Sequence, residues 1–108
     1  MPRMTVQALS VAANAVSSNV LAGQLYEFLD RPMPLLLAAT AAAVGINVTL
    51  LVGGVAIIND QPISQANRFP VLPDDVVTAV RRARGRVILT FRNTTAGAIL
   101  VNASVDVG

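Results

Sequence analysis

The chain contains no cysteine, no histidine and no lysine, and these absences restrict its chemistry. Without cysteine it forms no disulfide and has no thiolate nucleophile. Without histidine it lacks the usual proton shuttle at neutral pH and the commonest metal ligand. A serine or threonine nucleophile would need a histidine, a lysine or a terminal amine as its base. The sequence therefore favours a protein that is not an enzyme, and it predicts no metal and no other cofactor.

Charged residues are scarce as well. They make up 13% of the chain, against an ordinary share of about 25%, whereas 54% of the residues are hydrophobic. A chain of 108 residues is expected to form one domain, here spanning residues 1–108, and a domain of this size leaves much of its surface exposed. Many apolar groups must then either face water or be covered by neighbouring subunits. We favour the second interpretation, which makes the chain a homo-oligomer or a subunit of a larger assembly.

The stretch from Leu35 to Ile58 has no charged side chain. About 20 apolar residues suffice for a helix to cross a bilayer, so a small membrane protein with one span near 35–58 is an alternative. Strands are favoured because apolar residues alternate with Asn47 and Thr49 between Ile46 and Val52. Gly53-Gly54 then indicates a turn between two strands. The alanine-rich start of this stretch prefers helix intrinsically, and it is the weakest part of the prediction.

Other segments also show strand patterns. Residues 5–11 predict a first edge strand or extended arm, and residues 19–29 fit both periods and are interpreted as a strand. Two C-terminal hairpins are expected from the strands 76–80, 86–93 and 98–107, with turns at 81–86 and 93–97. These patterns predict an all-β fold.

The longest irregular segment is a central loop at residues 59–75, which contains three of the prolines. Phe69, Val71 and Leu72 would cost roughly 1.5–3 kcal/mol each if left in water. We expect them to anchor the loop, either on its own core or on an adjacent subunit, so that Phe69→Asp impairs assembly. Asp74 and Asp75 project differently and suit ion pairs with arginine better than acid–base catalysis.

All eight basic residues are arginines, and four of them cluster at Arg81, Arg82, Arg84 and Arg86. Arginine binds phosphate or carboxylate through two parallel hydrogen bonds. The cluster could be a solvated turn, an ion-pairing contact with another subunit, or a contact with nucleic acid. Nucleic acid is the least favoured of the three, because no aromatic side chain accompanies the cluster in sequence and the net charge is only +2.

Two segments, GGVAIINDQPISQANRFPVLPDDVV (53–77) and GRVILTFRNTTAGAILVNASVDV (85–107), resemble the second half of small β-sandwich proteins of tailless or icosahedral bacteriophage virions. The resemblance implies a single antiparallel, jelly-roll-like β-sandwich of about eight strands. It also implies a structural role in the capsid shell, at a vertex or as the base of a spike. Other virion proteins would then be the partners and the virion the location.

Overall fold

The computed structural model describes residues 3–24, 27–63, 65, 70 and 75–107. Its elements are six strands and, within these residues, no helix. In chain order the strands are β1 (Arg3–Val11), β2 (Phe28–Ala41), β3 (Ile46–Val52), β4 (Val55–Pro62), β5 (Val76–Asn93) and β6 (Ile99–Val107). They form one antiparallel sheet in the order β1-β6-β2-β5-β3-β4. The all-β prediction is confirmed, with six strands in the described residues where about eight were expected.

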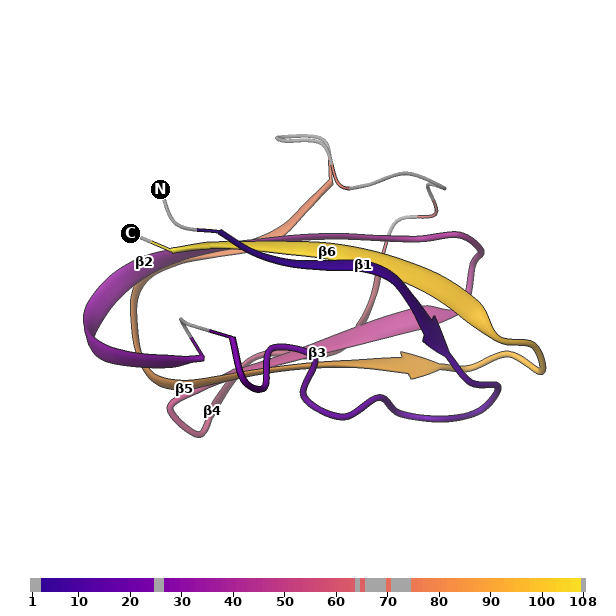
Figure 1. Ribbon diagram of the computed structural model, residues 1–108, viewed down its shortest axis with the longest axis horizontal. Helices are drawn as coiled ribbons and strands as arrows, with labels where there is room; N and C mark the ends of the chain where they lie inside the picture. The colour runs from indigo at the N-terminus through magenta and orange to yellow at the C-terminus, as the bar shows by residue number, and fades with distance from the viewer. Residues whose placement is uncertain (1–2, 25–26, 64, 66–69, 71–74, 108) are drawn as a thin grey trace.

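The sheet folds over on itself into two layers (Figure 1). One layer holds β1, β6 and β2, the other holds β3, β4 and the second half of β5, and both β2 and β5 curve from one layer to the other. β5 pairs with β2 from Val76 to Arg86 and with β3 from Val87 to Asn93. The β2–β5 register shifts three times, and such bulges bend strands. The irregular pairing is therefore what lets one sheet cover both sides of a core.

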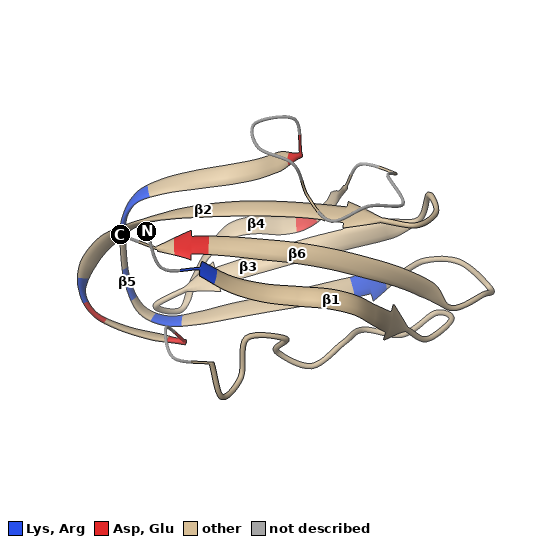
Figure 2. Cartoon of the chain, turned by 45° about the horizontal axis from the view of Figure 1, so that its top comes forward, with Lys and Arg blue, Asp and Glu red and all other residues tan. Residues whose placement is uncertain are grey.

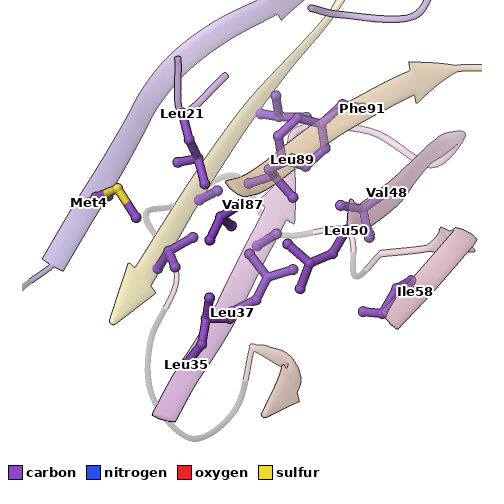
Figure 3. Close-up of a cluster of buried hydrophobic side chains, with 14 of the residues drawn as sticks. Met4, Leu21, Leu35, Leu37, Val48, Leu50, Ile58, Val87, Leu89 and Phe91 are labelled. Carbon is purple, nitrogen blue, oxygen red and sulfur yellow. The ribbon is translucent and has the colours of Figure 1, made fainter. Parts of the chain in front are cut away.

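The core lies between the two layers, where the inward faces of the strands meet (Figure 3). On β5 the buried residues alternate with more exposed ones, as expected for a strand with one face inside. Removing their apolar surface from water stabilises the fold at about 25 cal/mol per Å². The largest side chains that are fully buried include Leu21, Leu35, Leu37, Ile46, Val48, Leu50, Val87, Leu89, Phe91, Val101 and Val105.

The stretch from Leu35 to Ile58 forms strands, as its period-two pattern predicts. It contains the end of β2, all of β3 and the start of β4, and the turn at Gly53-Gly54 has positive φ at both residues. The alanine-rich end of β2 is almost entirely buried because β6 pairs along it. Its helical propensity is overridden by this pairing and burial. Within the described residues, no helix is long and apolar enough to cross a membrane.

The prediction of a turn at Arg81–Arg86 is wrong. β5 continues through these residues as one strand, and Gly85 (φ +100) lies within it at the curve. The two predicted hairpins are wrong as well, since β6 pairs with β1 and β2 and not with β5. The bends at 95–97, which follow the end of β5 at Asn93, carry the chain from one layer to the other. Polar turn residues marked the change of direction correctly, but they do not reveal which strands become neighbours.

The predicted strand at residues 19–29 is also wrong, because Val20–Gly23 form turns and β2 begins only at Phe28. This segment nevertheless covers one edge of β5. Ser17 Oγ accepts the amide of Phe91 at 2.9 Å, and Asn19 Oδ1 accepts the amide of Leu89 at 3.0 Å. Side-chain oxygens thus replace backbone carbonyls along the edge, so the backbone need not be extended.

Candidate interaction surfaces

Three ion pairs join described residues, and each contains one arginine. Arg3 Nε lies 2.6 Å from Asp106 Oδ1, Arg86 Nε lies 3.0 Å from Glu27 Oε2, and Arg92 Nη2 lies 2.6 Å from Asp60 Oδ2. Arg3 and Arg92 each donate a second hydrogen bond to the other oxygen of their partner. These pairs tie segments that are distant in sequence, so three of the eight arginines have structural partners.

Glu27, itself buried, is the centre of a partly buried polar network. Its Oε1 accepts the Gly23 amide at 3.0 Å, and its Oε2 accepts both the Asn19 amide group at 3.3 Å and Arg86 Nε. The Gly23 hydrogen bond, aided by Arg86, lowers the pKa of Glu27 below its ordinary value against the opposing effect of burial. The network fixes the start of β2 and holds Arg86 in place.

The remaining described arginines gather where β2 and β5 curve between the layers (Figure 2). We define the arginine bend as Arg31 of β2 together with Arg81, Arg82, Arg84 and Arg86 of β5. All five are exposed, and the first four form no ion pair with a described residue. β2 occupies one edge of β5 here, and no described strand pairs with the other edge. Charged side chains at an open strand edge disfavour its pairing with another strand.

An aromatic side chain lies beside the arginine bend, which the sequence did not suggest. Phe28 pairs with Arg86 across the β2–β5 ladder, and the guanidinium carbon of Arg86 lies 5.8 Å from the centre of the Phe28 ring. This distance is within the range of a cation–π interaction. Phe28 is nevertheless 64% exposed. The only signal in the sequence is an aromatic residue directly after Glu27 and two residues before Asp30-Arg31, which is too weak to identify the neighbour of an arginine.

The second candidate surface is the outer edge of β4, the last strand of the sheet. We call Val55–Ile58 the apolar edge, because it carries no charge and exposes Val55 (62%) and Ile57 (38%) while Ile58 points into the core. The other half of β4 has the usual features of a protected edge, namely the charged Asp60 with φ +55, and Pro62. At the opposite edge β1 has a bulge at Ala8 (φ +51), whose amide donates to Asn102 Oδ1.

Most of the loop residues predicted to make subunit contacts lie outside the described residues. These are Phe69, Val71, Leu72 and Asp74. Asp75 is described and is 5% exposed, and its carbonyl accepts the Ala39 amide at 3.2 Å. Asp75 takes part in further interactions as well, and its pairing with an arginine stays a prediction. The start of the predicted loop, residues 59–62, belongs to β4.

The two surfaces suit binding rather than reaction chemistry. The arginine bend offers guanidinium groups, which donate hydrogen bonds to anions and do not deprotonate in proteins. The apolar edge offers backbone amides, backbone carbonyls and aliphatic side chains. Among the residues that the structure describes, no group of three or more acidic side chains lies close enough to hold a metal ion. Comparison of the chain with family models, with curated proteins and with solved structures finds no match.

Proposed function

We propose that the chain is a structural subunit that assembles with copies of itself through the apolar edge of β4. The observation that carries this proposal is that Val55–Ile58 ends the sheet with an uncharged segment that exposes two large aliphatic side chains. Soluble proteins normally protect such an edge with charge, proline or a bulge. Here the protecting features stand only in the second half of β4.

Antiparallel pairing of two copies of β4 across a two-fold axis would give hydrogen-bond partners to the backbone groups at this edge. The segment pairs with itself because it has no charges to repel one another, and a two-fold contact is the commonest interface in homo-oligomers. Each copy gains backbone hydrogen bonds and covers Val55 and Ile57. Full burial of a large aliphatic side chain is worth about 1.5–3 kcal/mol. The sheet then runs continuously from one subunit into the next.

We further propose that the assembly is a bacteriophage capsid shell in which other virion proteins are the neighbours. Support comes from the resemblance of residues 53–77 and 85–107 to small phage β-sandwich proteins. The folded-over antiparallel sheet suits a minimal member of the jelly-roll-like sandwiches, with fewer strands than their usual eight or so. A shell protein of this kind acts through contacts and shape, which agrees with a chain that has no cysteine, histidine or lysine.

The test is the mass of the purified protein in plain buffer over a range of concentrations. We expect an oligomer whose dissociation is strongly promoted by Ile57→Lys or Val55→Lys. The matched control is Leu100→Lys, which places the same charge on an exposed residue of β6 (46% exposed). A wild-type chain that stays monomeric at every concentration, or a Leu100→Lys variant that dissociates as readily, would refute the role of β4.

The absence of native cysteine allows a second measurement. A single cysteine placed in turn at Val55, Ala56 and Ile57 should form an intermolecular disulfide under mild oxidation at one or more positions. Such a bond needs Cα atoms about 4.4–6.8 Å apart, and directly paired residues of antiparallel strands are about 4.5–5.5 Å apart. Leu100→Cys serves as the control, which should assemble but form no intermolecular disulfide.

A further inference from the structure

We propose that the arginine bend and Phe28 together bind single-stranded nucleic acid, with the arginines contacting phosphates and Phe28 stacking on a base. This site is separate from the apolar edge, and the proposal stands whether or not the chain assembles. The sequence alone ranked nucleic acid last because it showed no aromatic partner for the arginines. The pairing of Phe28 with Arg86 removes that objection.

The charge of the site is well above that of the whole chain. Arg31, Arg81, Arg82 and Arg84 are exposed and stand against a single exposed acid on the same curve, Asp30. The three ion pairs remove most of the other charges from consideration, because each cancels one arginine with one carboxylate. These four arginines and Asp30 sum to +3, whereas the whole chain carries +2, so positive charge is concentrated where β2 and β5 curve (Figure 2). A concentrated patch attracts a phosphate chain much better than the same charge spread over the surface.

Phe28 and Arg86 form a stacking platform that is already in place. Glu27 accepts a hydrogen bond from Arg86 Nε, and the guanidinium carbon lies 5.8 Å from the centre of the Phe28 ring. Glu27 itself is held by the Gly23 amide and by Asn19. Because Arg86 is already positioned, little side-chain entropy is lost when a base arrives. The 64% exposure of Phe28 leaves ring surface available for that base.

The exposed Phe28 ring favours nucleic acid over an acidic protein as the binding partner of this site. Arginine alone would serve an acidic peptide, whereas aromatic stacking beside arginine is typical of surfaces that bind unpaired bases. The other described aromatic, Phe91, is fully buried and belongs to the core. A peptide adding as a strand is disfavoured because the β2–β5 ladder has three register shifts, and an irregular, charged edge is a poor template. Duplex nucleic acid is disfavoured because its bases are already stacked on one another.

The experiment is fluorescence anisotropy of a dye-labelled oligouridylate of about 20 nucleotides, a length that exceeds typical single-strand site sizes. It is titrated with the wild-type chain at about 50 mM and about 200 mM salt. We expect Phe28→Leu to weaken binding roughly 5- to 100-fold, as the loss of one base stack does, and Phe28→Tyr to bind like the wild type. Neutralising Arg81, Arg82 and Arg84 to glutamine should reduce the dependence of log K on log salt by about 2, at about 0.7 for each phosphate contact.

Arg92→Gln is the control, since it removes one arginine from the same strand outside the bend. Its binding should change far less than that of Arg82→Gln, and the thermal unfolding of each variant shows whether it is folded. Three results overturn the proposal: no binding at the lower salt, equal binding by Phe28→Leu and the wild type, or equal binding of poly-glutamate and the oligonucleotide. The last result would make the bend a contact for acidic proteins.

Discussion

The contact between Gly53 and Gly85 gives the sharpest test of how the sheet is bent. Gly85 lies in the curve of β5 with φ +100, and Gly53 lies in the β3–β4 turn with φ +58. The Gly53 amide donates to the Arg86 carbonyl at 3.0 Å. A Cβ on Gly85 would stand 2.8 Å from Gly53 Cα, and a Cβ on Gly53 would stand 2.6 Å from the Arg84 carbonyl oxygen. Only two glycines allow backbones to approach this closely.

We therefore expect Gly85→Ala to destabilise the fold by two separable effects. An L-residue with positive φ is strained by roughly 1–2 kcal/mol. The added methyl meets backbone that cannot rotate away, and such overpacking costs about 1–3 kcal/mol more. Gly54→Ala is the matched control, because Gly54 also has positive φ (+84) but its Cβ would meet nothing within 4 Å. The loss of chain freedom in the unfolded state is similar for both substitutions and cancels in the comparison.

Urea unfolding at fixed protein concentration measures the difference. With an m-value of about 2 kcal/mol per molar urea, the midpoint of Gly85→Ala should lie roughly 0.5–1.5 M below that of Gly54→Ala. The concentration must be fixed because association would stabilise the folded state. If Gly85→Ala is as stable as Gly54→Ala, the close approach does not limit the bend, and the register shifts alone must produce it.

Three further substitutions test the polar network, the turn after β5 and the core. Because the pKa of Glu27 is lowered in the folded state, its carboxylate stabilises the fold above its unfolded pKa of about 4.3, and this stabilisation is lost as pH falls through the lower folded pKa. The wild type should therefore be more stable than Glu27→Gln near neutral pH, and the gap in melting temperature should close on acidification; a gap independent of pH would contradict the assignment. Asn93 is 1% exposed, donates to two carbonyls and accepts from Thr95, so Asn93→Ala should cost about 2–4 kcal/mol in urea unfolding, from unsatisfied buried groups at about 1–3 kcal/mol each. Asn59 is exposed, so Asn59→Ala should lower the free energy of unfolding very little. Equal losses for the two variants would show that the hydrogen bonds of Asn93 do not stabilise the turn. Phe91→Ala should cost about 3–5 kcal/mol in the same assay, whereas Phe28→Ala should cost about 1 kcal/mol or less; similar losses would show that Phe28 is a core residue.

The local structure of several segments could be predicted from the sequence because short-range rules determine it. The alternation from Ile46 to Val52 requires one face inside, and Gly53-Gly54 supplies the positive φ values of a tight turn. The first strand was also predicted, although its predicted start at residue 5 is two residues later than the observed start at Arg3. In each case the pattern concerns residues within one strand or one turn.

The pairing of strands could not be predicted in the same way. Arg81–Arg86 has the composition of a turn, but the residues before and after it belong to one long strand that curves. That curve depends on β2 lying beside β5 with three register shifts, which is a contact between segments far apart in sequence. The strand prediction for residues 19–29 was wrong for a related reason, since Asn19 forms hydrogen bonds to the backbone of β5 through its side chain.

The candidate sites show the same difference between local patterns, which the sequence reveals, and contacts between distant segments, which it does not. Arg81, Arg82, Arg84 and Arg86 were found from sequence because they lie within one short segment, 81–86, and their type alone indicates an anion. Phe28 was missed because its relation to them is set by the β2–β5 register. The exposure of Val55 and Ile57 was missed because alternation shows that a strand has two faces without showing whether a strand borders the sheet.

The two proposed surfaces are neighbours, and this gives them a joint consequence. Gly53 contacts Gly85 inside the arginine bend, and the apolar edge begins only two residues later at Val55. Pairing of two copies through β4 would therefore bring two arginine bends into one assembly near the shared edge. A long single strand could then contact both, and linking two sites in this way raises apparent affinity by about 10²- to 10⁴-fold without a new contact. Ile57→Lys should thus weaken the binding of a long oligouridylate while leaving that of a short one unchanged. Equal effects on both lengths would mean that the substitution disturbs the bend itself, and no effect on either would mean that the two sites act independently.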